Sequence, residues 1–426
     1  MSVRLQWVCT SVTAIVLAGI VFSGVAAAET GSTAWTAGPR GTVSFIVAPS
    51  RSFHNGPTAE NIKVNVLDIP GLAKITFSQD TSSCGLVWSW DKKSVPGALP
   101  LNVLFPGLPG GERYHLMYTW DADAGVFSGY FNGVPMRMPG TVVERWRMDT
   151  RAIKNVDFGE WNVKDLRIYP EYMSGTDATD QVPTELRGMH ADLMGKFPPR
   201  PAIDVNRRLG KLLYASSLAD SDSVAGWVLE GPGIISHEDG WIKMASKRPE
   251  GPEGNIVYWA PPDFPVRFVA DWEMQILSKE GLCIVFFSAK GTNGQDLFDP
   301  TLPPRDGVFK KYTKGAIRAY HISYYTNNPT ARPGRVTSNL RKNPGFYLAT
   351  IGPAGIPIGS KNVHKVRLIR DNAHMQLLID GKVIIDYTDN GKTYGPLHGN
   401  GKIGFRQMKW TVARYRNLKV WTLKKP

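Results

Sequence analysis

Short stretches in which apolar and polar residues alternate recur along the chain, separated by turns rich in glycine, proline and asparagine. An alternation with a period of two residues indicates a strand that buries one face. Long stretches with helical periodicity are scarce. The pattern therefore predicts an all-β protein built from sandwiches.

Two parts of the chain repeat one plan of strand, polar turn, second strand and a later closing strand. The first uses residues 114–133 and 161–170, and the second uses 364–381 and 413–423. Each hairpin ends in Asn-Gly or Asp-Gly, which tight turns with positive φ favour. We therefore expect two related β-sandwiches, over residues 35–170 and 211–423. The first and last strands of the second sandwich should pair.

Residues 171–210 have a different composition and are interpreted as a linker. Within them, TELRGMHADLMGKF is compatible with a short helix that begins near Thr184 and is stopped by Pro198. The expected architecture is thus two sandwiches joined by a partly helical linker.

The chain opens with a short positive region, an apolar run and Ala26-Ala27-Ala28, which together are typical of a secretory signal peptide over residues 1–28. Cleavage after Ala28 would deliver a secreted or periplasmic protein with no stable membrane insertion. The two cysteines beyond the leader, Cys84 and Cys283, fall in different predicted sandwiches, so free thiols are favoured over a disulfide.

The net charge is +13, with an isoelectric point near 9.5. In an exported protein this favours an anionic partner, and an acidic polysaccharide or oligosaccharide fits best. Nucleic acid is disfavoured because no recognition helix, zinc pattern or RNA-binding signature is present. A merely soluble basic protein would have the same charge.

The stretch RFVADWEMQIL places Asp271, Glu273 and Gln275 on one face of a strand and an apolar set on the other. The arrangement resembles the catalytic strand of laminarinase-type retaining glycosidases, in which acidic residues alternate. Gln275 stands where a third acidic residue would be expected. Double displacement needs two carboxyl groups about 5 Å apart. Asp271 and Glu273 are therefore candidates, and a solvated strand face is the simpler interpretation.

The stretch AYHISYYTNNP places His321, Ser323 and Tyr325 on one face and Tyr320, Ile322 and Tyr324 on the other. If the second set packs in the core, His321 and Tyr325 line a groove. The reverse register would bury His321 and expose Tyr324, and periodicity leaves both registers open.

These residues, with Arg341 from the next segment, suit β-elimination on a uronate polysaccharide. Arg341 would neutralise the carboxylate, His321 would be the base and Tyr325 would protonate the leaving group. The set resembles that of jelly-roll alginate lyases. His321 as a structural histidine is the alternative. Candidate substrate-binding residues are Gln275, Lys290, Tyr324, Asn339, Lys342, Arg406 and Gln407.

No cofactor and no metal site is expected. Asp296 and Asp299, in the loop after FFSAKG, could hold calcium through oxygen ligands, but the EF-hand spacing is missing. Aspartate in such loops more commonly caps turns.

Residues 211–423 resemble the YesU-like family of domains of unknown function. The resemblance is carried by VADWEMQI, FFSAKGTNGQDLFDP, YHISYY, NLRKNPGF, LIDGKVIIDY and GKIGFRQM. It implies a concanavalin-A-like jelly-roll β-sandwich in bacterial polysaccharide degradation and supplies no catalytic residues. Residues 35–170 resemble concanavalin-A-like, laminin-G-like sandwiches through YHLMYTWDADAGVFSGYFNGV. This implies a second concanavalin-A-like jelly-roll β-sandwich, which would be a binding or supporting module.

Three functions follow for the second sandwich, which is expected to be the catalytic unit. They are a polysaccharide lyase acting on an acidic glycan, a glycoside hydrolase using Asp271 and Glu273, and a lectin-like binding protein. The lyase is the first choice because of the basic charge. All versions expect Asp271, Glu273, His321, Tyr325 and Arg341 to converge in one concave groove.

Overall fold

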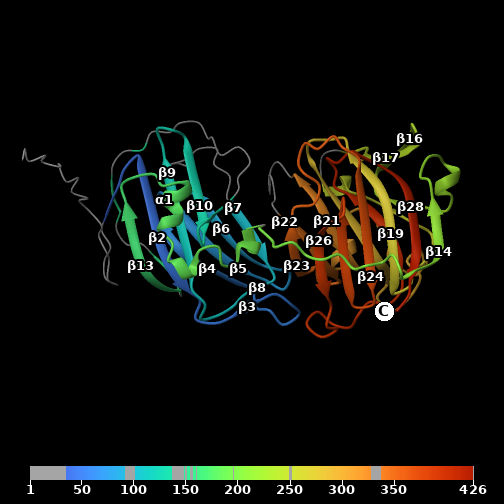
Figure 1. The fold of residues 1–426 in the computed structure, drawn as a ribbon, viewed down its shortest axis with the longest axis horizontal. Helices are drawn as coiled ribbons and strands as arrows, with labels where there is room; N and C mark the ends of the chain where they lie inside the picture. The colour runs from blue at the N-terminus through green and yellow to red at the C-terminus, as the bar shows by residue number, and fades with distance from the viewer. Residues whose placement is uncertain are drawn as a thin grey trace, which may run out of the picture.

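The structure is a computed structural model that describes residues 35–91, 101–136, 148, 151–153, 157–159, 161–194, 196–248, 252–327 and 337–425. The predicted signal peptide and its cleavage site lie outside the described residues. Within them the protein is mostly β, as predicted, and its sheets fall into an N-terminal and a C-terminal unit (Figure 1).

The N-terminal unit consists of sheets that run from β1 to β13. One has the order β11 (Val134–Pro135), β10 (Val126–Phe131), β9 (Tyr114–Asp121), β2 (Arg40–Ala48) and β13 (Asn162–Tyr169). A second has the order β4 (Ile62–Ile69), β5 (Ala73–Gln79), β6 (Cys84–Trp90) and β7 (Leu101–Phe105). Short pairs join β1 (Trp35–Ala37) to β12 (Arg151–Ile153) and β3 (Phe53–His54) to β8 (Gly107–Leu108).

The C-terminal unit is a sandwich of two antiparallel sheets. The β19 sheet has the order β16 (Gly233–Glu238), β17 (Trp241–Ser246), β28 (Ala413–Leu423), β19 (Arg267–Ile276), β24 (His364–Asp371), β25 (His374–Ile379) and β26 (Lys382–Thr388), and β14 (Leu209–Ser216) pairs with β28. The β21 sheet has the order β15 (Val228–Glu230), β18 (Ile256–Trp259), β27 (Lys402–Gln407), β20 (Gly281–Gly291), β21 (Ile317–Asn327), β22 (Thr337–Asn343) and β23 (Tyr347–Pro353).

Local sequence signals for the C-terminal unit are confirmed. The alternate apolar residues of β19, with Trp272 at their centre, lie in the core between the two sheets. The turn Asp380-Gly381 between β25 and β26 has positive φ at both residues, 50° and 80°. The first and last strands, β14 and β28, pair as expected. Turn chemistry and periodicity thus predicted this hairpin and the inward face of β19.

The predicted linker helix is wrong in detail. The segment forms two 3₁₀ turns, Thr184–Leu186 and Ala191–Met194, instead of one α-helix. Gly188 lies between them with φ +72°, which no α-helix accommodates. A short α-helix, α1, precedes them at Gly175–Asp180. Elsewhere the described helical segments are Asp222–Val224, Pro252–Gly254 and α2 (Lys310–Thr313).

The two units are in contact through edge strand β23. Leu348 and Ile351 of β23 belong to the hydrophobic cluster of the N-terminal unit. The backbone N–H of Leu348 donates to Ser82 O at 2.9 Å, and Asn55 Nδ2 donates to Leu348 O at 3.0 Å. Tyr394 Oη donates to Asn55 Oδ1 at 2.8 Å. The N-terminal unit therefore covers an edge that would otherwise be exposed to other strands.

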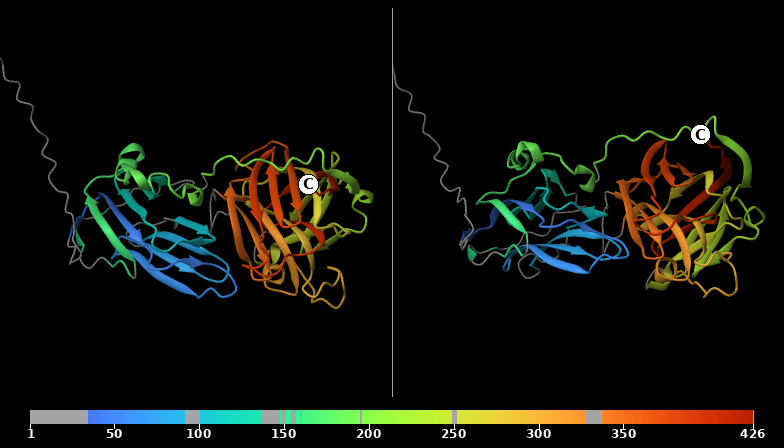
Figure 2. Two further views of the ribbon diagram at one scale, coloured as in Figure 1. Left: turned by 60° about the horizontal axis from the view of Figure 1, so that its bottom comes forward. Right: turned by 90° about the horizontal axis from the view of Figure 1, so that it is seen from below.

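The linker passes along one side of both units in each view (Figure 2). Its last part reaches the outer face of the β19 sheet, where Ile203 and Val205 pack against Val269 and Ile369. Among the described residues, no helix has the length and apolar character needed to cross a membrane.

Candidate functional site

Three polar side chains of β19 lie in a row on the outer face of the β19 sheet, as the alternation predicted. Asp271 accepts two hydrogen bonds from Arg367, with Nε to Oδ1 at 2.7 Å and Nη2 to Oδ2 at 2.6 Å. Arg416 Nε donates to Glu273 Oε2 at 2.5 Å. Arg414 Nε donates to Gln275 Oε1 at 2.7 Å. Each acidic residue of the predicted hydrolase pair is therefore already bound to a guanidinium.

An open cleft of about 530 Å³ lies on this face. Its volume falls in the range of small-molecule sites. The β28 strand bulges here, because its register against β19 shifts between Asp271 and Glu273. The lining residues are Asp271, Trp272, Glu273, Lys365, Val366, Arg367, Leu378, Gly381, Asn417, Lys419 and Trp421.

The lining combines an aromatic side chain with positive charge. Trp421 is partly exposed, and Lys365 and Lys419 are exposed. Among the described residues, neither lysine forms an ion pair, whereas Asp271 and Glu273 are neutralised by arginines. The cleft therefore carries excess positive charge beside an indole ring.

The sequence prediction missed Lys365, Arg367, Lys419 and Trp421. Their alternation in HKVRLIRD and RNLKVWTL places them on an outer face. The missing information was that β24 and β28 are the two neighbours of β19. Pairing between strands that are distant in sequence is not visible in the pattern of any one strand.

His321 and Arg341 lie on the other sheet of the sandwich. They face each other as Cα partners on β21 and β22, and Ser323 and Asn339 form the next such pair. All four are at most 5% exposed. The polar side chains of β19 and those of β21 both point away from the common core. Asp271 and Glu273 therefore lie on the opposite side of the sandwich from His321. The predicted single groove does not form: periodicity gives the face of a strand but not the sheet that it joins.

His321 is enclosed by neighbouring side chains. Its ring centroid lies 5.2 Å from that of Phe286, 6.4 Å from Phe309 and 5.6 Å from Phe346. Its Nδ1 is 2.8 Å from Asn343 Nδ2, so the amide donates to the ring. The position fits a structural histidine better than a base that must reach a polysaccharide.

Arg341 is used within the protein. Its Nη1 donates to Ser82 O at 2.9 Å and to Phe346 O at 2.6 Å, and its guanidinium lies 3.8 Å from the centroid of the Phe346 ring. Ser82 belongs to the N-terminal unit, so Arg341 is part of the contact between the units.

Tyr325 does not share a face with His321, contrary to the prediction. The register between β20 and β21 shifts after Ser323, so that Tyr324 and Tyr325 both pack in the core. Tyr325 Oη donates to Lys279 O at 2.7 Å, and burial raises the pKa of Tyr325 to about 12. A β-bulge thus removes the acid from the predicted lyase set.

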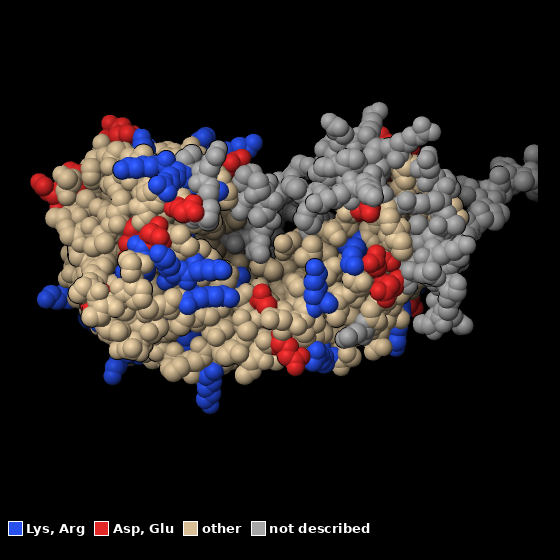
Figure 3. All heavy atoms as spheres, turned by 180° about the vertical axis from the view of Figure 1, so that it is seen from behind, with Lys and Arg blue, Asp and Glu red and all other residues tan. Residues whose placement is uncertain are grey.

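Two other predicted substrate-binding residues, Gln407 and Lys290, are bound to partners within the protein. Gln407 is fully buried and hydrogen-bonds the Tyr415 hydroxyl at 2.9 Å. Lys290 pairs with Asp263 at 2.8 Å. Figure 3 shows lysine and arginine side chains gathered on the face of the C-terminal unit opposite to the view of Figure 1, with carboxylates among them.

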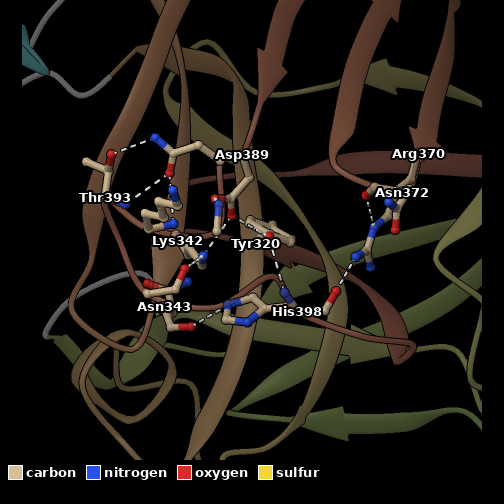
Figure 4. Close-up of polar contacts among 12 residues, drawn as sticks. Tyr320, Lys342, Asn343, Arg370, Asn372, Asp389, Thr393 and His398 are labelled. Carbon is tan, nitrogen blue, oxygen red and sulfur yellow. Dashed lines mark hydrogen bonds and ion pairs between the residues drawn. The ribbon is translucent and has the colours of Figure 1, made fainter.

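Lys342 belongs to a buried polar network (Figure 4). Its Nζ donates to Asp389 Oδ2 at 2.7 Å, and Tyr320 Oη donates to the same oxygen at 2.6 Å. The backbone N–H of His398 donates to Tyr320 Oη at 3.3 Å, and His398 Nε2 donates to Asn343 O at 2.9 Å. The network fixes the loop after β26 against the end of the sandwich.

The loop aspartates cap turns. Asp296 Oδ1 accepts from the backbone N–H of Phe298, and Asp299 Oδ1 accepts from that of Thr301, both at 2.8 Å. In the part of the chain that the structure describes, no group of three or more histidine, cysteine, aspartate or glutamate residues could hold a metal ion.

The C-terminal unit is therefore a two-sheet β-sandwich domain with an open, basic cleft on one outer face. Residues 211–420 match the family described as "domain of unknown function (DUF1961)", and the chain belongs to this family. The uncharacterized protein YesU of Bacillus subtilis is 37% identical over 213 residues, which cover 50% of this chain and 96% of YesU.

A solved structure from Bacillus subtilis, described as a protein of unknown function with a galectin-like fold, is also similar. It is 34% identical and covers 51% of this chain and 99% of its own, with a TM-score of 0.48. Glycoside hydrolases, a carbohydrate-binding module and carbohydrate recognition domains match at 10–14% identity with TM-scores of 0.31–0.36. Likenesses this distant do not assign residues.

Proposed function

We propose that the C-terminal domain binds an acidic glycan in the cleft on the outer face of the β19 sheet, as a secreted carbohydrate-binding protein. The observation that carries the proposal is the combination of Trp421 with Lys365 and Lys419 in one open cleft of about 530 Å³. An indole ring offers an apolar face for the C–H groups of a pyranose. The lysines would pair with carboxylate or sulfate groups of the chain.

The charges favour an acidic over a neutral glycan. Because Arg367 and Arg416 balance Asp271 and Glu273, the two lysines set the sign of the cleft. The net charge of +13 acts in the same direction over longer distances. Secretion through the predicted leader would bring the protein to extracellular polysaccharides.

Hydrolysis is the second candidate, because Asp271 and Glu273 line the same cleft. It requires one carboxyl group to donate a proton and the other to attack. Both oxygens of Asp271 are bound to Arg367, which leaves binding as the better supported function. The lyase is less favoured, because His321 is enclosed and Tyr325 is in the core.

The proposal is tested by titration calorimetry with polygalacturonate, alginate and a neutral glucan. Trp421→Ala should lower affinity for the acidic glycan roughly tenfold, equivalent to about 1.4 kcal/mol. The double variant Lys365→Gln/Lys419→Gln should bind the acidic glycan more weakly at low salt. Its affinity should also depend much less on salt concentration than that of the wild type. Lys310→Gln, an exposed lysine outside the cleft, is the matched control.

The same mixtures are read for unsaturated uronates and for new reducing ends. Reducing ends that disappear in Glu273→Gln would establish the hydrolase, and unsaturated uronates that disappear in His321→Ala would establish the lyase. Wild-type affinity in both cleft variants would place the glycan elsewhere and reject the proposed site.

A further inference from the structure

Arg370 and Arg406 are among the largest fully buried side chains of the C-terminal unit, and they differ in how their N–H groups are used. Arg370 is 1% exposed, and each of its nitrogens donates a hydrogen bond: Nε to Asn372 O, Nη1 to Ser288 Oγ and Gly399 O, and Nη2 to His398 O (Figure 4). This is the pattern expected of a structural arginine.

Arg406, on the outer face of the β21 sheet, is 0% exposed and only its Nη2 donates, to Gly307 O at 2.9 Å. Its Nε and Nη1 have no hydrogen-bond partner among the described residues. The rings of Phe309 and Tyr312 lie 5.1 Å and 4.8 Å from its guanidinium. Aromatic faces stabilise the charge but accept no N–H bond of ordinary strength.

The charges around Arg406 do not balance. Glu230 is the acidic residue of this cluster, and its Oε1 accepts from Arg305 Nη2 at 2.6 Å, while its Oε2 accepts from Trp259 Nε1 at 2.9 Å. Arg305 is also buried, and its Nε lacks a partner among the described residues. Glu230 therefore pairs with Arg305 and not with Arg406, and three N–H nitrogens of the two arginines lack a partner among the described residues.

An excess buried charge with unpartnered donors is strongly unfavourable unless a ligand compensates it. We propose that Arg406 and Arg305 hold one small oxyanion against the outer face of the β21 sheet, under the segment that carries Phe309 and Tyr312. The oxyanion is either a free ion or the carboxylate of a sugar acid. The site is independent of the glycan cleft, which lies on the opposite sheet.

The test is thermal unfolding of the full chain at constant ionic strength, in which sodium chloride is replaced by acetate, phosphate or glucuronate. The Tm of the C-terminal transition should rise with concentration and saturate, by roughly 5–10 °C at a hundred times Kd. A rise with acetate or phosphate indicates a free oxyanion, and a rise with glucuronate alone indicates a sugar acid.

Arg406→Met should abolish the rise and leave the Tm in chloride unchanged or higher, because it removes an uncompensated charge. The rise of Tm with anion concentration should persist in Trp421→Ala and in Arg267→Met, which removes a partly exposed arginine. A wild-type protein that is indifferent to all three anions would overturn the proposal. If Arg406→Met does not fold, crystals grown with selenate decide: an anomalous peak within hydrogen-bond distance of Arg406 supports the site, and water alone there rejects it.

Discussion

The buried pair Lys342–Asp389 allows a quantitative test of what holds the C-terminal unit together. The exposed fractions of the two side chains are 2% and 0%, and Nζ lies 2.7 Å from Oδ2. Burial lowers the pKa of Lys342 despite its partner. Burial alone would raise the pKa of Asp389. The hydrogen bonds from Lys342 and Tyr320 have the larger effect, so this pKa lies below its usual range.

Lys342→Met would leave the Asp389 charge buried and remove the donor to Gly395 O. Loss of one partner from a buried pair costs about 3–5 kcal/mol. At about 2–4 °C per kcal/mol for a unit of this size, the Tm should fall by roughly 6–20 °C. The double variant Lys342→Met/Asp389→Asn should recover much of this loss, because an amide still accepts from Tyr320.

The pair Lys311–Asp306 is the matched control. Its Nζ–Oδ2 distance is 2.8 Å, but its side chains are 42% and 55% exposed. Lys311→Met should therefore cost no more than about 1 kcal/mol. Differential scanning calorimetry of these three variants, of Asp389→Asn alone and of the wild type measures these shifts. Equal losses at the two pairs, or a double variant as unstable as the sum of its singles, would refute the reasoning.

Three further outcomes are expected. Burial lowers the pKa of His398 to about 3; the unfolded chain therefore binds more protons below pH 6.5, and stability should fall by about 1.4 kcal/mol per pH unit as the pH drops towards 3. Thermal unfolding from pH 4 to 7 should show a shallower slope in His398→Gln, and identical slopes would contradict this. Gly352→Ala would place Cβ 1.6 Å from the Ile384 carbonyl oxygen. It should lower the free energy of unfolding, measured by chemical denaturation, by at least about 1–3 kcal/mol. An unchanged midpoint would show that the edges of the two sheets can separate. Burial raises the pKa of Cys84 and of Cys283 to about 12, so a thiol reagent at pH 8 should modify them only after unfolding, and rapid labelling of the native protein would be inconsistent with their burial.

The candidate site shows how far a pattern of residues can be taken. Asp271 and Glu273 were correctly placed on an outer face, because the side of a strand follows from the period of two. For His321 the alternation left both registers open, and the structure has the register with Tyr320 packed in the core. Tyr325 was misplaced because one bulge reverses the alternation beyond it, and no residue type in SYYT marks that bulge.

The sequence by itself determined the local features: an all-β chain, hairpins closed by turns such as Asp380-Gly381, and the inward face of strands such as β19. These depend on neighbours a few residues apart. Only the tertiary structure decided that β24 and β28 flank β19, that Trp421 and Lys365 line one cleft with Asp271, and that Ser82 binds Arg341 across the two units. The physical reason is that these contacts join distant segments, and their choice depends on the packing of whole sheets.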